Sequence, residues 1–192
     1  MISFLRHFFL WLLLLLAVHP ADPASPTDER ALWRALGSGG HVVLMRHALA
    51  PGIGDPSNFR IGDCSTQRIL DQTGRAQAKR IGERFRANGI VTAQVFASQW
   101  CRTTETAQLL NLGSVEPLPP LNSFFQQGDD SAQTQAMRQW LAKRDLSRPT
   151  VLVTHQVNIT SLTGVYPSSG EMVVARRGAK GELEVVGTLR TE

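Results

Sequence analysis

Short apolar runs rich in β-branched residues alternate along this chain with longer stretches of helical periodicity. The runs expected to form strands cover residues 41–45, 91–97, 150–154, 171–176 and 183–189. The stretches expected to form helices cover residues 28–36, with Thr27 as the N-cap, and residues 74–88, 102–111, 131–144 and 157–162. Strands that alternate with helices favour a mostly parallel sheet with helices on both faces. The sequence therefore predicts an α/β fold, a three-layer α/β/α sandwich with a mostly parallel central sheet.

Finer expectations concern the segments between and within these elements. Residues 48–72 and 114–128 are rich in Pro or Gly and are expected to be loops. Thr73 is expected to cap the helix that follows it. The run 150–154 is apolar and β-branched, so we expect it at the centre of the sheet.

The first 21 residues resemble a secretory signal peptide. A short start with Arg6 precedes the almost wholly apolar stretch 8–18, and prolines and small residues follow. We therefore expect residues 1–21 to be a signal peptide, residues 22–192 to be a single domain, and the protein to be periplasmic or secreted. The alternative is an uncleaved N-terminal anchor, which would give the protein its membrane contact.

The chain has two cysteines, Cys64 and Cys101. An even number of cysteines in an exported protein indicates a disulfide. Closing a loop of about 38 residues would stabilise the fold by roughly 3–4 kcal/mol in the chain-entropy model. The alternative is a pair of buried free thiols.

The charge pattern narrows the choice of partners. Arg6 is the one Lys or Arg before residue 22, so 19 of the 20 basic residues remain beyond it, against 16 acidic ones. No basic run is interleaved with aromatic residues, so we expect a small anionic substrate and no nucleic acid. We expect no dinucleotide cofactor, because no G-x-G-x-x-G motif follows the first strand. We expect no metal, because the cysteine pair lacks ligand spacing.

Polar residues follow three of the expected strands. Arg46 and His47 follow the first, Ser98 to Arg102 follow the second, and His155 follows the third. Ligands in open α/β sheets bind at the carboxyl ends of strands. We therefore expect these residues to meet at one edge of the sheet.

Together these residues suit metal-free phosphoryl transfer. A neutral imidazole, His47, can attack phosphorus and form a phosphohistidine that water then hydrolyses. Arg46 and Arg102 can bind the phosphoryl oxygens and stabilise their negative charge. His155, if protonated, can add a further donor. The four catalytic candidates are thus Arg46, His47, Arg102 and His155.

Three motifs resemble those of the histidine phosphatase superfamily, also called phosphoglycerate mutase-like. They are Arg46-His47-Ala48, the segment from Ser98 to Ala107, and Val153-Thr154-His155. The segment from Gln67 to Ala78 resembles the family's approach to its first long helix. The resemblance covers roughly residues 40–165. It implies a phosphoglycerate mutase-like sheet with strands in non-sequential order and a metal-independent phosphohistidine mechanism.

The chain departs from the family at the general acid. Many members carry an acidic residue where this chain reads Leu121-Asn122-Ser123-Phe124-Phe125. Asp129 and Asp130 are the next candidates; the alternatives are a substrate that needs no acid, or a slow enzyme. The solvated start of the following helix is the simpler interpretation of both aspartates. Glu105 is expected to orient arginine side chains, and Arg68 and Asn158 are weaker candidates for substrate binding.

These features predict an exported phosphatase of a phosphomonoester, with a phosphorylated sugar of the cell envelope as one candidate substrate. The competing hypothesis is a weakly active or inactive module that binds phosphate on the same fold. It rests on the absent acid.

Overall fold

A computed structural model describes residues 28–125 and 131–191. The expected signal peptide, its alternative as an anchor, and Asp129 and Asp130 lie outside the described residues. Within the described ranges, no helix combines the length and the apolar character needed to cross a membrane.

The described residues form one six-stranded sheet in the order β3-β2-β4-β1-β5-β6. The strands are β1 (His41–Arg46), β2 (Gln94–Ala97), β3 (Val115–Pro117), β4 (Thr150–Thr154), β5 (Met172–Arg177) and β6 (Leu183–Leu189). The four strands from β3 to β1 pair in parallel. β5 runs antiparallel to β1, and β6 runs antiparallel to β5. The sheet is mostly parallel, as the sequence predicts, and β4 lies between β2 and β1.

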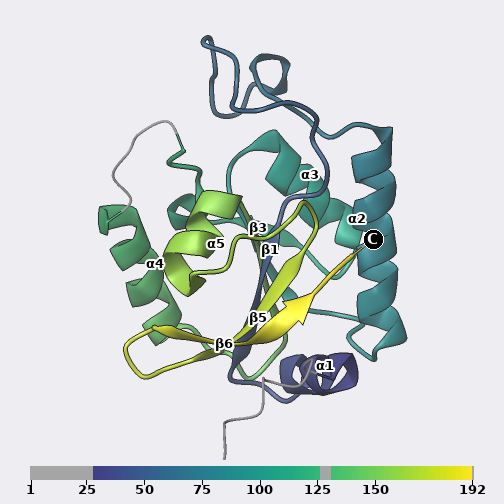
Figure 1. The fold of residues 1–192 in the computed structure, drawn as a ribbon, viewed down its shortest axis with the longest axis vertical. Helices are drawn as coiled ribbons and strands as arrows, with labels where there is room; N and C mark the ends of the chain where they lie inside the picture. The colour runs from purple at the N-terminus through teal and green to yellow at the C-terminus, as the bar shows by residue number, and fades with distance from the viewer. Residues whose placement is uncertain (1–27, 126–130, 192) are drawn as a thin grey trace, which may run out of the picture.

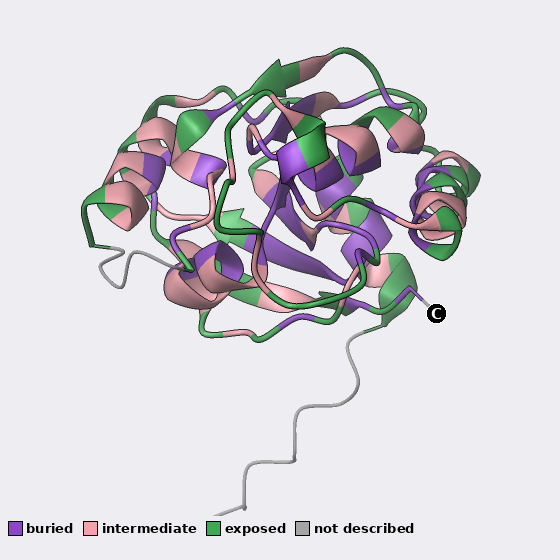
Figure 2. Ribbon diagram, turned by 90° about the horizontal axis from the view of Figure 1, so that it is seen from above, coloured by how far each residue is buried: buried purple, intermediate pink, exposed green. Residues whose placement is uncertain are grey.

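Helices cover both faces of the sheet (Figure 1). They are α1 (Glu29–Gly37), α2 (Gln72–Ala87), α3 (Cys101–Leu110), α4 (Ser131–Lys143) and α5 (Gln156–Thr163). Alternating residues of each strand point to opposite faces. Val43 and Val151 therefore pack with α1, α2 and α3, whereas Leu44 and Leu152 pack with α4 and α5. This alternation produces the predicted three layers, with the buried strands at the centre (Figure 2).

Three local expectations were wrong. The N-cap of α1 is Asp28 in place of Thr27, and its carboxylate accepts a hydrogen bond from the Arg30 amide at 3.0 Å. The N-cap of α2 is Asp71, whose carboxylate accepts a hydrogen bond from the Gly74 amide at 2.7 Å, so Thr73 lies inside the helix. Residues 115–117, expected within a loop, form the edge strand β3. A three-residue strand that ends in proline has too few residues to show a period, and its pairing depends on β2.

Gly82 allows α2 and α3 to pack closely. A Cβ atom at Gly82 would lie 2.2 Å from the carbonyl oxygen of Leu110, far inside van der Waals contact. Gly37, at the end of α1, has open space at the same position. A glycine in the middle of a helix normally costs roughly 0.5–1 kcal/mol relative to alanine. The close contact between α2 and α3 accounts for its presence at position 82.

We expect Gly82→Ala to lower the free energy of unfolding by about 1–3 kcal/mol, since the backbone of α3 must move. Gly37→Ala is the matched control and should leave stability unchanged or raise it. Urea denaturation of both variants measures the difference. A Gly82→Ala protein as stable as the parent would contradict the close packing of α2 against α3.

Candidate active site

The carboxyl ends of β1, β2 and β4 meet at one edge of the sheet. Arg46 pairs with Thr154 across β1 and β4, and Ala97 pairs with Val153 across β2 and β4. The first amide after β1, that of His47, donates to the Thr154 carbonyl at 3.0 Å. Parallel register therefore brings His47, Ser98 and His155 to the same level.

His47 is buried with only 2% of its surface exposed. Its Nδ1 lies 2.8 Å from the carbonyl oxygen of Ala48, so Nδ1 carries the proton and donates it. Nε2 accepts a hydrogen bond from Nε of Arg102 at 3.2 Å. Burial, followed by the charge of Arg102, lowers the pKa of His47 to about 3. The imidazole is therefore neutral, with its lone pair on Nε2.

His155 is buried beside His47, with 5.6 Å between the ring centroids. Its Nδ1 accepts from Arg102 at 3.4 Å, so its Nε2 donates to the Ser98 hydroxyl at 2.8 Å. Burial is the largest cause that lowers the pKa of His155 well below its usual value, followed by the charges of His47 and Arg102. The sequence analysis proposed His155 as a donor if it is protonated; before substrate enters, this histidine is neutral.

Two further arginines line the same pocket. Arg46 donates from Nη1 to the Pro167 carbonyl at 3.0 Å, and its Nε is buried without a partner. A buried donor without an acceptor is costly, so a ligand oxygen would satisfy it. Arg68 is held by carbonyl oxygens of the preceding loop, those of Gly54 and Ala50.

Asp55 is the charged residue of the pocket lining that the sequence analysis missed. Its carboxylate accepts from Nη1 and Nη2 of Arg102 at 2.7 and 3.1 Å, and from the Trp100 indole at 3.0 Å. Burial raises the pKa of Asp55, but the hydrogen bonds and charge of Arg102 outweigh it and lower the pKa. The one available signal was the location of Asp55 in a long loop between two candidate site residues.

The loop that carries Asp55 is fixed to the start of α3. Cys64 and Cys101 form the predicted disulfide, with their Cα atoms 5.7 Å apart. The Cys101 amide donates to the Gln67 side chain at 2.9 Å. Phe59 stacks on Trp100 with 4.8 Å between the ring centroids. These contacts hold Asp55 against Arg102.

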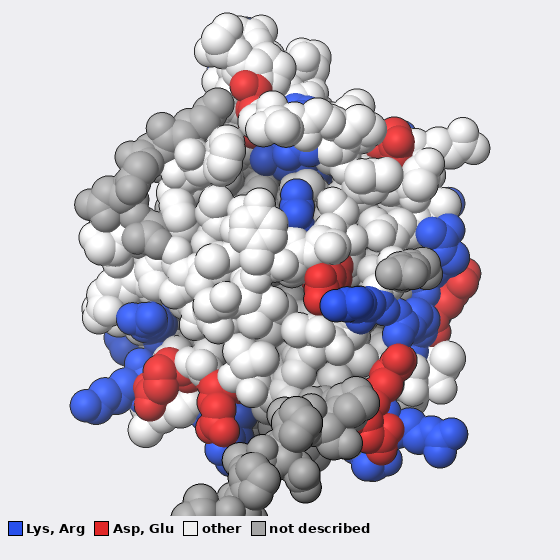
Figure 3. Space-filling model, viewed as in Figure 1, with Lys and Arg blue, Asp and Glu red and all other residues white. Residues whose placement is uncertain are grey.

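The pocket has a volume of about 340 Å³. Arg46, His47, Arg68, Arg102 and His155 all line it, together with Asp55. In Figure 3, Lys or Arg atoms lie recessed beneath the projecting loop, framed by uncharged side chains. The structure therefore brings the four catalytic candidates and Arg68 into one cavity.

Other candidates lie apart from this cavity. The Asn158 amide donates to the Asn122 carbonyl at 2.9 Å, and Asn158 does not line the pocket. Glu105 does orient an arginine, as expected, but its partner is Arg75 at 2.5 Å, which is also outside the lining. Among the residues that the structure describes, no group of three or more His, Cys, Asp or Glu side chains could hold a metal ion.

The comparisons with known proteins agree with the motifs and the topology. The family model of the histidine phosphatase superfamily (branch 1) matches residues 42–122. The fold is that of the histidine phosphatase superfamily. The resemblance inferred from the three motifs is thus confirmed. A comparison with curated protein sequences gave no match.

Several solved structures share this histidine phosphatase fold. The protein histidine phosphatase SixA, complexed with tungstate, is 15% identical, with 79% of this chain and 97% of that chain covered and a TM-score of 0.58. Phosphoserine phosphatase from Entamoeba histolytica is 12% identical, with coverages of 79% and 98% and a TM-score of 0.55. A mycobacterial glucosyl-3-phosphoglycerate phosphatase is 15% identical, with coverages of 78% and 98% and a TM-score of 0.54. At these identities the likeness concerns the fold.

We expect the free energy of unfolding to fall as the pH drops from about 6.5 toward 3. The folded pKa of His47 is depressed from 6.5 to about 3, so over this range the unfolded chain binds the proton and the folded one does not. His155, depressed in the same direction, adds to the loss. Each histidine contributes at most about 1.4 kcal/mol per pH unit.

Urea denaturation at pH values between about 5 and 7 measures this slope. His47→Gln should give a shallower dependence than the parent, because it removes one of the two titrating rings. Identical slopes in the two proteins would contradict the neutral, buried state of His47.

Proposed function

We propose that this protein is a metal-independent phosphatase that hydrolyses a phosphomonoester through a phosphohistidine on Nε2 of His47. The observation that carries the proposal is the neutral His47 ring, which lines the pocket with its unprotonated Nε2 hydrogen-bonded to Nε of Arg102. The similarity to SixA, phosphoserine phosphatase and glucosyl-3-phosphoglycerate phosphatase supports a phosphatase.

In the first step, a phosphoryl oxygen takes the hydrogen bond that Nε of Arg102 gives to Nε2 of His47. The freed lone pair of Nε2 attacks phosphorus, and the bond to the leaving oxygen breaks. The hydrogen bond from Nδ1 to the Ala48 carbonyl stabilises the positive charge that develops on the ring. Arg46, Arg68 and Arg102 stabilise the charge on the phosphoryl oxygens. The negative charge of the bound phosphoryl group would raise the pKa of His155. A protonated His155 would then be the further donor that the sequence analysis proposed.

In the second step, water attacks phosphorus, the N–P bond breaks, and the lone pair returns to His47. The leaving oxygen must gain a proton in the first step, and the attacking water must lose one in the second. A phosphoryl group bound to Arg102 would take the donors now given to Asp55. The freed carboxyl, beside an anion, would then have a raised pKa and could carry this proton. Asp55 thus joins Asp129 and Asp130 as a candidate general acid.

The proposal includes export to the periplasm or secretion, with an N-terminal anchor as the alternative. The Cys64–Cys101 disulfide supports it, because disulfides persist in oxidising compartments. An envelope sugar phosphate remains one candidate substrate on the strength of export and family resemblance.

The second candidate function is a phosphate-binding module with little or no turnover. One observation favours it: Asp55, the one carboxylate among the described residues that line the pocket, is ionised and paired with Arg102, so in this state it has no proton to give to a leaving group. Turnover distinguishes this module from the enzyme, whereas binding of phosphate does not.

The purified protein should hydrolyse an aryl phosphate without added metal, and vanadate should inhibit it. His47→Ala should lower kcat by at least about a thousandfold, since the nucleophile is lost. The variant's melting temperature serves as the control for folding. Equal turnover by His47→Ala and the parent would contradict the phosphohistidine mechanism.

Asp55→Asn should separate the two effects of that carboxylate. Phosphate should bind about tenfold more tightly, because a competing charge is gone. Turnover of an alkyl phosphate should fall much more than turnover of an aryl phosphate, whose leaving group needs no proton. Asp63→Asn, an aspartate of the same loop that does not line the pocket, is the matched control. An equal loss on both substrates would instead assign Asp55 to positioning Arg102.

A further inference from the structure

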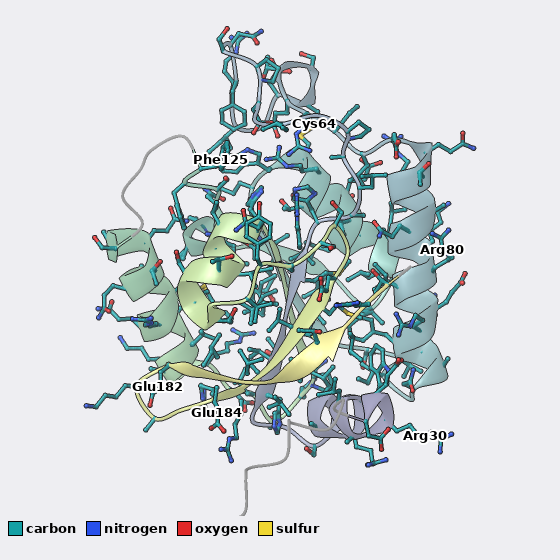
Figure 4. All side chains as sticks on the ribbon, in the orientation of Figure 1. Arg30, Cys64, Arg80, Phe125, Glu182 and Glu184 are labelled. Atoms are coloured by element: carbon teal, nitrogen blue, oxygen red, sulfur yellow. A yellow bond between two sulfur atoms is a disulfide. The ribbon has the colours of Figure 1, made fainter. Side chains whose placement is uncertain are left out.

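Exposed apolar side chains gather at the mouth of the pocket. Eight large apolar residues are exposed among the described parts of the chain, and four of them line this cavity: Ile53, Ile61, Phe125 and Tyr166. Contiguous exposed apolar surface on a soluble protein commonly marks a binding site. Figure 4 places Phe125 and Cys64 at the same end of the molecule, where the loop of Asp55 projects.

Below this mouth the apolar wall continues to the catalytic candidates. Phe59 stacks on Trp100, and Trp100 lies edge-on to His155 with 5.3 Å between the centroids. Val157 also lines this space. A group attached to a phosphoryl at His47 would therefore pass along aromatic and aliphatic surface on its way to solvent.

Polar side chains other than the charged ones and the two histidines are few on the wall: Ser123, Gln156 and the hydroxyl of Tyr166, and two of the three are partly engaged. The Gln156 amide donates to the Thr160 hydroxyl at 2.8 Å, and the Ser123 hydroxyl accepts from the Phe125 amide at 3.3 Å. The charged residues of the lining are the three arginines and Asp55, which belong to the phosphoryl site described above. A sugar needs several fixed hydrogen-bond partners for its hydroxyl groups, and unpaired hydroxyls against apolar surface are costly.

We propose that the substrate is a phosphomonoester with an apolar leaving group, an alkyl or aryl phosphate, in preference to a sugar phosphate. The three arginines of the lining bind the dianionic phosphoryl group. The apolar side chains of the lining, among them Trp100 and Ile61, bind the apolar leaving group. The inference rests on the proposed function for its chemistry. It replaces the envelope sugar as the substrate class that the pocket favours.

Binding of alkyl phosphonates to the full chain tests the wall without requiring turnover, since their P–C bond does not hydrolyse. Calorimetry should give a dissociation constant that falls from methyl- to butyl- to hexylphosphonate, by about threefold for each methylene that is buried. Equal affinities for methyl- and hexylphosphonate would overturn the proposal.

Two isoleucines of similar exposure provide a matched pair. Ile61, 51% exposed, lines the pocket, whereas Ile69, 44% exposed, does not. Ile61→Ser should weaken hexylphosphonate binding about threefold or more and leave methylphosphonate binding unchanged. Ile69→Ser should change neither. Loss of the chain-length effect in both variants, or in neither, would assign the effect to another surface and overturn the proposal.

Turnover of ethyl phosphate, hexyl phosphate and glucose 6-phosphate gives the second readout, because all three release a primary alcohol. We expect kcat/KM for hexyl phosphate to exceed the other two by about tenfold or more. A preference for glucose 6-phosphate would overturn the inference while leaving the proposed function intact. Chain-length-dependent binding with no turnover of any substrate would support the apolar site and overturn the proposed phosphatase.

Discussion

The guanidinium of Arg102 is the contact on which the site depends. It donates to both histidines and to Asp55, and it is almost completely buried. A buried cation is stable only where its donors are satisfied, so each partner needs its own fixed support. Parallel register supplies this support for His47 and His155, and the tethered loop supplies it for Asp55. Burial keeps both imidazoles neutral and the charge of Arg102 adds to that effect, while its hydrogen bonds and charge keep Asp55 ionised.

The positions of the catalytic candidates could be predicted from the sequence because they depend on a general rule. Parallel strands end at one edge of a sheet, so His47 and His155 had to be neighbours once their strands were recognised. The fold followed from the same alternation. The disulfide followed from an even cysteine count in a chain that the sequence analysis expects to be exported.

Asp55 could not be predicted, because no local pattern joins it to Arg102. Their contact depends on the path of an irregular loop, which the disulfide and the Phe59–Trp100 stack determine. The edge strand β3 depends likewise on β2, since three residues carry no period of their own. The prediction of the α2 cap failed for a smaller reason. Asp71 and Thr73 are both good capping residues, and the choice between them depends on where the chain turns.

The position of β4 has a consequence for how this protein folds. β1 and β2 each pair with β4 and not with one another, although β4 comes more than fifty residues after β2 in the chain. Residues 42–122 therefore contain His47 and Arg102 but lack the strand that sets their spacing. The ribosome must therefore synthesise the chain beyond His155 before β4 can pair with β1 and β2 and complete the pocket. Such distant pairing makes folding slow, which leaves the new chain unfolded for longer.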